Sequence, residues 1–355
     1  MVFTNTLMRA AAKMGPYKAP FEVITVPHPG RPRENEVTIK VESVGVCGTD
    51  LSIYKWTETV AREYHPQFPH IPGHEFSGTV VSIGSGVKSL RIGDRVAVNP
   101  HISCNACEFC RQGNQNICPN RPILGCHVGG GLAEFINVRE MNVFKLPDGL
   151  PPHLGCLAEP LSVAVHALER VYQEHNKASA AIVGAGTIGL LQFLACRAMG
   201  YEKIVVIGLD VDAERLKLAE SMGALTINLG KDDLRRKMTE YIGKPEADVC
   251  FEVAGTNDSI NLAIDLVKST GKIALVGIAA GQTPIDTTKL LFTEKELIGC
   301  RAYRLDTWPK TMELMGRIIP ELEKLVTHRL PLEQINEAIA LLEQRKCLKV
   351  VIEPA

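Results

Sequence analysis

The chain has 355 residues, of which 45% are hydrophobic and 22% are charged, and its formal net charge is −1. This length exceeds one ordinary hydrophobic core, so we expect two domains. The nearly neutral charge argues against a nucleic-acid partner, and no apolar run reaches the roughly 18 residues that a transmembrane helix needs. Because residues 1–17 also lack the apolar segment of a signal peptide, the sequence predicts a cytoplasmic protein without a membrane partner.

Residues 1–150 have the pattern of a β-rich domain. Residues 36–46 and 75–87 alternate between apolar and polar side chains with the period of two that strands require, and residues 94–98 form a short apolar run. Glycine and proline residues separate these segments, as they do between the strands of antiparallel sheets. We therefore expect a β-sheet domain at the start of the chain.

Four cysteines are concentrated in a lobe at about residues 101–120. They are Cys104, Cys107, Cys110 and Cys118, with the spacing C-x2-C-x2-C-x7-C. The chain has 11 cysteines and we expect it to be cytoplasmic, so this spacing indicates a metal site rather than disulfides. A closed four-thiolate zinc site fits the spacing and leaves no position open for a substrate, which predicts a structural role. An iron–sulfur cluster and a redox thiol pair are the competing interpretations.

After about residue 160 the pattern changes to alternating strands and helices. Short apolar segments that read as strands are found at 180–186, 203–210, 247–255 and 271–277. Helix-length segments at 188–200 and 213–223 lie between them, and each ends at a glycine. This alternation predicts βαβ units and a doubly wound parallel sheet.

The end of the chain mixes helix and strand, with a helix expected at 331–346 and a strand at 348–354. We expect this segment to return to the first domain and complete it. The predicted organisation is therefore a catalytic domain of residues 1–160 and 300–355, interrupted by a nucleotide-binding domain of residues 161–299.

A dinucleotide-binding motif follows the first strand of the second domain. The pattern GxGxxG is formed by Gly184, Gly186 and Gly189, with Thr187 and Ile188 between the last two. At a strand-to-helix turn, the glycines allow a tight turn and let the pyrophosphate approach the helix N-terminus. Asp210 ends the next strand, 21 residues beyond Gly189, where a carboxylate accepts hydrogen bonds from the adenosine ribose and repels a 2′-phosphate. The motif predicts NAD; the alternative for Asp210 is a loop aspartate without a ligand.

Candidates for a reactive centre lie elsewhere in the chain. Cys47 follows a predicted strand in "GVCGTD", His74 and Glu75 are adjacent in "PGHEFSG", and Glu159 lies at the predicted domain junction in "LAEPLSVAVHA". A thiolate, an imidazole and a carboxylate, with one position left for substrate, would make a catalytic zinc site. Each residue also has a structural explanation: a small buried thiol, a buried histidine and a carboxylate at a helix start.

These motifs together resemble the zinc-dependent medium-chain dehydrogenase/reductase family, and the resemblance spans nearly the whole chain. It is carried by the motifs above and by "GDRVAV", "GGGLAEF" and "VTHRLPLE". Within the family the chain is most similar to the polyol (sorbitol-type) and threonine dehydrogenases. The resemblance implies a GroES-like catalytic domain, a Rossmann domain, two zinc ions per chain, NAD, and a homodimer or homotetramer.

The resemblance also implies roles for individual residues. Cys47 and His74 match zinc ligands, and Glu75 and Glu159 match carboxylates that ligate the metal directly or through water. Thr49 matches the hydroxyl that contacts the substrate alcohol. The cofactor contacts are matched by Asp210, Arg215, Val276, Gly277 and Ile278. Ser52 stands where many relatives have a relay histidine, and the family's arginine near the substrate is either Arg301 or Arg304.

The sequence thus predicts an oxidoreductase that transfers a hydride from a secondary alcohol of a polyol or sugar-derived substrate to NAD, giving a ketone. Thr49 and Ser52 would pass the proton away. One alternative is a threonine 3-dehydrogenase, which Tyr54 and Trp56 favour and the missing relay histidine disfavours. A sugar-phosphate or sugar-acid dehydrogenase is another. A metal-free quinone-type reductase and a noncatalytic nucleotide-binding protein are less compatible with the candidate ligands.

Overall fold

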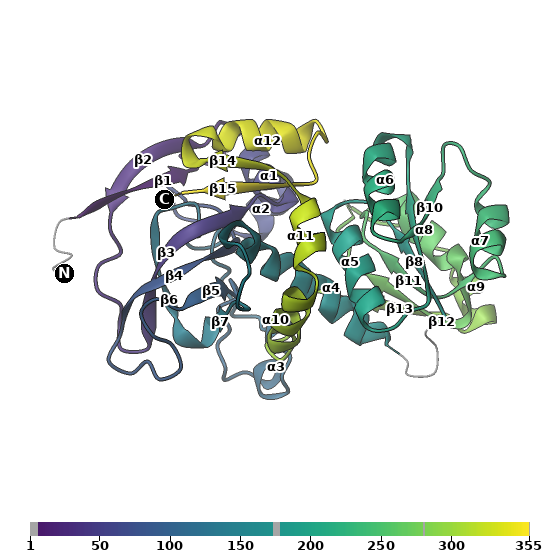
Figure 1. Ribbon diagram of the computed structural model, residues 1–355, viewed down its shortest axis with the longest axis horizontal. Helices are drawn as coiled ribbons and strands as arrows, with labels where there is room; N and C mark the ends of the chain where they lie inside the picture. The colour runs from purple at the N-terminus through teal and green to yellow at the C-terminus, as the bar shows by residue number, and fades with distance from the viewer. Residues whose placement is uncertain (1–5, 173–177, 280, 355) are drawn as a thin grey trace. The chain divides into compact units, whose positions relative to one another are not determined.

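A computed structural model describes residues 6–172, 178–279 and 281–354, and Figure 1 shows its helices and strands. The chain divides into two compact units, one of residues 1–159 and 315–355 and the other of residues 160–314. No helix in the described part of the chain is long and apolar enough to cross a membrane.

The first unit is built on a mostly antiparallel sheet in which strands from both ends of the chain lie side by side. Its seven described strands follow the order β14-β15-β3-β4-β5-β7, with β6 paired to β3 (Figure 1). They are β3 (Glu36–Gly45), β4 (Glu75–Ile83), β5 (Arg95–Val98), β6 (Phe135–Arg139), β7 (Val143–Lys145), β14 (Val326–Pro331) and β15 (Lys349–Glu353). A separate hairpin is formed by β1 (Leu7–Ala12) and β2 (Glu22–Pro27).

The helices of the first unit are short, and α11 and α12 pack against strands of this sheet. They are α1 (Gly48–Lys55), α2 (Glu58–Glu63), α3 (Glu108–Arg111), α11 (Ile319–Leu325) and α12 (Ile335–Glu343). The 3₁₀ segments are η1 (Gln115–Ile117), η2 (Glu140–Asn142), η3 (Pro152–Leu157) and η5 (Leu332–Gln334). The core includes Val41 and Val44 of β3, Val350 of β15 and Ile339 of α12, all nearly inaccessible to solvent. Burial of these apolar side chains fixes the C-terminal strand against β3.

The second unit contains a fully parallel sheet in the order β10-β9-β8-β11-β12-β13. Its strands are β8 (Ser179–Val183), β9 (Lys203–Gly208), β10 (Leu225–Asn228), β11 (Ala247–Glu252), β12 (Val267–Leu275) and β13 (Glu296–Gly299). This order is that of the Rossmann fold, in which the chain starts in the middle of the sheet and reverses direction there. The predicted fold class, a β-rich domain combined with a doubly wound domain, is confirmed.

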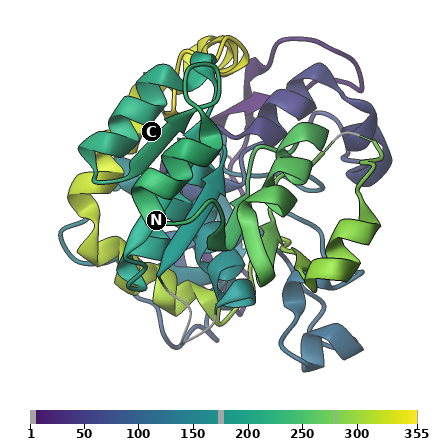
Figure 2. The same ribbon diagram turned by 90° about the vertical axis from the view of Figure 1, so that its right-hand side faces the viewer.

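Helices lie on both faces of the parallel sheet (Figure 2). They are α5 (Thr187–Ala198), α6 (Ala213–Ser221), α7 (Leu234–Ile242), α8 (Asn257–Leu266) and α9 (Thr287–Thr293), with η4 (Asp210–Asp212) before α6. Local signals set their ends: Asp233 caps α7 by accepting from Arg236 N–H, and Gly243 ends it with a φ of 80°.

Helices α4 (Ala158–Val171) and α10 (Thr307–Arg317) contain the two divisions of the chain. The sequence-based boundary at residue 300 differs from the structural division, which falls after Leu314. Hydrogen bonds within the second unit explain why the structural division falls later in the chain than the sequence-based boundary. Ser162 Oγ donates to Thr311 Oγ1 at 3.1 Å, and Thr307 Oγ1 donates to Glu169 at 2.9 Å, so residues at the start of α10 are held to α4.

Candidate active site

Cys47 lies between β3 and α1, where the chain leaves a strand and begins a helix. It is the N-cap residue of α1 and has an extended backbone, with φ −107° and ψ 162°. The carboxylate of Asp50 accepts a hydrogen bond from Cys47 N–H at 2.8 Å and so closes the first turn.

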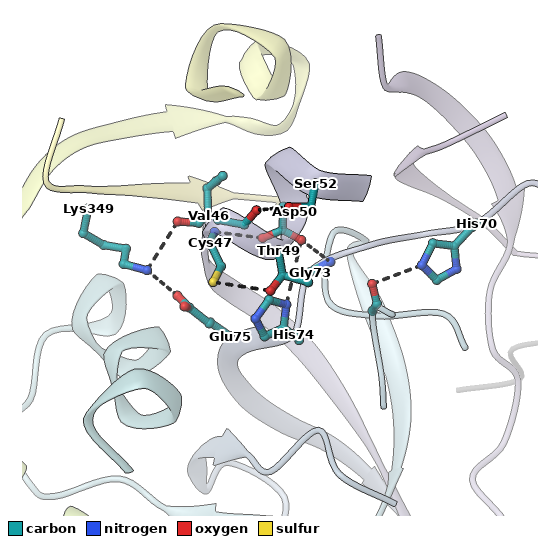
Figure 3. Close-up of polar contacts among 12 residues, drawn as sticks. Val46, Cys47, Thr49, Asp50, Ser52, His70, Gly73, His74, Glu75 and Lys349 are labelled. Atoms are coloured by element: carbon teal, nitrogen blue, oxygen red, sulfur yellow. Dashed lines mark hydrogen bonds and ion pairs between the residues drawn. The ribbon is translucent and has the colours of Figure 1, made fainter. Parts of the chain in front are cut away.

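His74 immediately precedes β4, after a tight turn at Gly73. Gly73 has a φ of +93°, and a Cβ there would lie 2.9 Å from Val44 Cγ1, so this turn requires glycine. Gly73 N–H donates to Asp50 Oδ1 at 3.3 Å, and the same oxygen lies 3.9 Å from His74 Nδ1. Asp50 therefore anchors both the cysteine and the histidine segments (Figure 3).

Three metal-binding side chains come together at this point. Cys47, His74 and Glu75 each offer one donor atom, and these atoms all lie within 4.8 Å of one another. Alternation along a strand would send two neighbouring side chains to opposite faces. That rule does not apply here because β4 begins only at Glu75, and His74 belongs to the turn.

The electrostatics of this group favour a cation. Burial alone would lower the pKa of His74, but the charge of Cys47 and hydrogen bonds with Cys126 and Cys47 raise that pKa well above its ordinary value. A site that attracts a proton in this way also attracts a metal ion. One thiolate, one imidazole and one carboxylate form the donor set of a catalytic zinc site with one open position.

A buried lysine completes the surroundings of Glu75. Lys349 Nζ lies 2.5 Å from Glu75 Oε2 and 3.3 Å from the carbonyl oxygen of Val46 (Figure 3). The two side chains are 4% and 2% exposed. Burial disfavours the charged lysine, but the negative charge of Glu75 outweighs it and raises the pKa of Lys349. An added Cβ on Gly45, the cross-strand partner of Glu75, would overlap with the Glu75 carboxylate, so glycine leaves the space that this carboxylate occupies.

The four cysteines of the lobe converge around α3. The Cys104 sulfur lies 3.9 Å from that of Cys110 and 3.4 Å from that of Cys118, and the Cys107 and Cys118 sulfurs are 3.8 Å apart. Tetrahedral ligation with zinc–sulfur bonds of about 2.3 Å places the sulfurs about 3.8 Å apart, so these separations fit one ion. A multinuclear iron–sulfur cluster would hold the sulfurs further from one another.

The backbone contributes to this second site. Hydrogen bonds from the N–H groups of Ala106 and Cys107 lower the pKa of the Cys104 thiol to about 6. Burial raises the pKa of Cys110 to about 12, so this thiol needs the charge of a metal ion to lose its proton. The donor set is closed, which fits a structural ion.

In the second unit, the glycine motif lies at the carboxyl end of β8. Gly184 has a φ of +121°, Gly186 is the N-cap of α5, and a Cβ on Gly189 would overlap with the carbonyl oxygen of Gly184. These three positions therefore form the tight strand-to-helix turn that the motif predicts. The N-terminus of α5 offers backbone N–H groups and the positive end of the helix dipole, which fit a pyrophosphate.

Two protein-family models match the chain, and each lies mainly in one of the two units. Residues 33–148 match the family model of the alcohol dehydrogenase GroES-like domain, and residues 187–317 match that of the zinc-binding dehydrogenases. The chain belongs to the zinc-dependent medium-chain dehydrogenase/reductase family. It is accordingly an enzyme of the alcohol and polyol dehydrogenase type, and zinc and a nicotinamide dinucleotide are its cofactors.

Two curated relatives and one solved structure illustrate the similarity. The chain is 34% identical to sorbitol dehydrogenase of Bacillus subtilis (strain 168) over 98% of this chain and 97% of that protein. It is 36% identical to L-threonine 3-dehydrogenase of Xanthomonas axonopodis pv. citri (strain 306), over 93% and 95%. The crystal structure of 2R,3R-butanediol dehydrogenase from Bacillus subtilis superposes with a TM-score of 0.88 at 32% identity, covering 98% of this chain and 100% of that one.

The structure also places the other residues to which the family resemblance assigns a role in the reaction. Glu159 is buried in the first turn of α4, but its carboxylate is not part of the group within 4.8 Å formed by the described ligands. Thr49 Oγ1 lies 3.9 Å from the Cys47 sulfur, and Ser52 Oγ donates to Gly48 O at 3.0 Å. The roles assigned to Glu159, Thr49 and Ser52 stay predictions.

On the cofactor side, Asp210 follows β9 and is 60% exposed. Arg215 Nη1 binds Asp212 at 3.0 Å. Val276, Gly277 and Ile278 follow β12, at the same carboxyl edge of the sheet, and the Ile278 side chain is 82% exposed. Arg301 is exposed, whereas Arg304 Nε lies 3.7 Å from Asp306 and is half-buried, which leaves the choice between the two arginines open.

Two residues of the metal site were not found from the sequence. Asp50 could have been found, because a carboxylate three residues after an N-cap marks a capping box. Lys349 was harder to identify, because the sequence indicates it only as a single lysine inside the apolar segment "LKVVIEP". A buried lysine almost always has a charged partner, but its identity depends on strand pairing.

Proposed function

We propose that the enzyme is an NAD-dependent polyol dehydrogenase that oxidises a secondary alcohol of a polyol or sugar-derived substrate to a ketone. The observation that carries the proposal is the donor set of Cys47, His74 and Glu75, which leaves one position open on a tetrahedral zinc ion. The similarity to sorbitol dehydrogenase over nearly the whole length of both chains supports the polyol class.

When bound, zinc supplies a Lewis acid that lowers the pKa of the substrate hydroxyl, and NAD supplies the hydride acceptor. The protein holds and orients these groups. Asp50 fixes the segments that carry Cys47 and His74, and Lys349 offsets the charge of Glu75 beside the metal site. Preorganised charges of this kind do not have to reorganise during the reaction.

Thr49 is the residue best placed to take the proton from the substrate. Its hydroxyl lies 3.9 Å from the Cys47 sulfur, within the coordination surroundings. Ser52, one turn later on α1, would carry the proton onward, and its hydroxyl must then turn away from the Gly48 carbonyl that it contacts. Thr49→Val should lower kcat with little effect on zinc content.

Threonine is the second candidate substrate, because a threonine dehydrogenase relative is 36% identical over 93% of the chain. Tyr54 and Trp56 match that group, and both are packed against neighbours: Tyr54 against Phe21 and Trp56 against Phe68, with ring centroids 5.7 Å and 5.3 Å apart. Sugar phosphates and sugar acids remain further alternatives.

The experiment is a substrate panel followed through the absorbance of the reduced nicotinamide. Free polyols, 2,3-butanediol, sugar phosphates, sugar acids and threonine are compared with NAD and with NADP, and Cys47→Ser provides the background rate. We expect the highest kcat/KM for a free polyol with NAD. A higher value for threonine would replace the polyol assignment, and no turnover of any alcohol would refute the proposed function.

The ligand set is tested by zinc content. Glu75→Gln should lose the catalytic zinc, whereas Glu159→Gln should keep it and lose about 10–100-fold in activity, as is typical of a residue behind the ligands. If both variants keep zinc and full turnover, neither carboxylate belongs to the site. We further propose a homodimer or homotetramer, which light scattering of the purified enzyme decides.

A further inference from the structure

Asp210 is the residue on which the proposed choice of NAD depends, and a neighbouring loop holds its side chain. The loop, Asn228–Asp232, starts at the last residue of β10. Because β9 and β10 are adjacent parallel strands with Asn228 opposite Gly208, the start of the loop lies beside the segment that carries Asp210. Leu229 N–H donates to Gly208 O at 3.0 Å and continues this pairing beyond the strand.

Both oxygens of the Asp210 carboxylate face this loop. Asn228 Nδ2 donates to Asp210 Oδ1 at 2.9 Å. Asp210 Oδ2 lies over Gly230, where an added Cβ would come within 2.6 Å of that oxygen. Lys231 Nζ lies 3.6 Å from Oδ1. One oxygen is therefore held by an amide, and the other occupies a space that only glycine leaves open.

The amide of Asn228 is itself fixed in orientation. Its Oδ1 accepts a hydrogen bond from Gly230 N–H at 2.9 Å, so its Nδ2 must face Asp210. The backbone N–H of Asn228 donates to Asp232 at 2.8 Å, and its carbonyl accepts from Lys231 and Asp232 N–H. All the polar groups of Asn228 have partners, which makes the loop a rigid support.

We propose that Asn228 is a positioning residue for cofactor selection, and this inference rests on the proposed function. It holds the Asp210 carboxylate where that group accepts hydrogen bonds from the two adenosine ribose hydroxyls and repels a 2′-phosphate. A freely rotating carboxylate at this exposed position would be screened by water and could turn away from a phosphate. Selectivity therefore depends on the orientation of Asp210 as well as on its charge.

The test measures dissociation constants for NADH and NADPH by calorimetry, so it does not depend on turnover. Asn228→Ala should weaken NADH binding about 3–10-fold and change NADPH binding less than about twofold, because the lost hydrogen bond holds a charged group at an exposed position. Gly230→Ala, which forces the carboxylate to move, should have the same effect. Asp232→Ala is the matched control: it removes the hydrogen bond to the Asn228 backbone N–H but keeps both hydrogen bonds of the Asn228 amide, so the ratio of the two constants should stay as in the wild type.

A double-mutant cycle separates positioning from general loop damage. In an Asp210→Ser background, Asn228→Ala should not change the ratio of the two constants any further, because no carboxylate remains to be positioned. The inference is overturned if Asn228→Ala leaves the ratio unchanged in the wild-type background, weakens both cofactors equally, or acts as strongly without Asp210. If the wild type binds neither NADH nor NADPH, the proposed function itself fails.

Discussion

Replacing Lys349 with methionine tests whether the buried ion pair supports the metal site. Methionine keeps most of the length of the lysine side chain but removes the charge that lies 2.5 Å from Glu75 Oε2. Glu75 is 2% exposed, so in the metal-free protein Lys349→Met leaves its carboxylate buried without this cationic partner. Breaking a buried pair from one side costs about 3–5 kcal/mol, so we expect the free energy of unfolding of the first unit to fall by that amount.

The assay uses the two tryptophans of the chain. Trp56 belongs to the first unit and Trp308 to the second, so a Trp308→Phe background leaves Trp56 as the fluorescence reporter of the first unit. Urea unfolding is then compared for the background protein, Lys349→Met, Glu75→Gln and the double variant, all freed of metal with a chelator so that the loss of zinc from the Glu75 variants does not enter the comparison.

The double variant is the decisive comparison. Replacing both members of a buried pair by neutral groups is often nearly neutral for stability, so it should recover more than half of the loss seen with Lys349→Met alone. A loss below about 1 kcal/mol for Lys349→Met, or strictly additive effects of the two substitutions, would show that the pair does not stabilise the site.

Three further outcomes are expected. Cys107→Ser should halve the zinc content and lower the melting temperature before it lowers kcat; unchanged stability with lost turnover would contradict a structural lobe. Asp210→Ser should tighten NADPH binding at least tenfold, because Lys231 then faces the 2′-phosphate, and calorimetry would disprove this if only NADH binding changed. Burial opposes the charge of Asp248, but hydrogen bonds from two lysines and Ser179 lower its pKa to about 2. This carboxylate therefore stabilises the fold above its ordinary pKa of 3.8, and the contribution is lost as the pH falls toward 2. Asp248→Asn should cost about 2 kcal/mol at pH 7 and less at pH 3 in urea titrations.

Local sequence was sufficient for much of the candidate site. The four lobe cysteines are close in sequence, so their spacing alone indicated a metal site, whereas His74 and Glu75 were assigned to one through the family resemblance. The glycine motif was identifiable from its place between strand and helix. The same reasoning overextended one strand: the alternation at residues 75–87 predicted a longer segment than β4, which ends at Ile83 before the turn at Gly84.

Contacts between distant segments could not be read in this way. Lys349 meets Glu75 because β15 pairs with β3, and Asn228 meets Asp210 because β10 pairs with β9. Both pairings depend on the whole sheet rather than on a local pattern. The short strands β6 and β7 were also missed, since three to five residues give too little alternation to distinguish a strand from a loop.

The return of β15 to the first sheet also has a consequence for biosynthesis. Lys349 is made 274 residues after Glu75, an interval of about 14–55 s at 5–20 residues per second. Residues 160–314 form a contiguous unit that leaves the ribosome within this interval and can fold before β15 exists. Throughout that time the β3 positions that later pair with β15 stay open and the Glu75 carboxylate has no lysine. The nascent first unit therefore has an unpaired edge at β3 during this interval, and the surroundings of its metal site can be completed only after the nucleotide-binding unit has been synthesised.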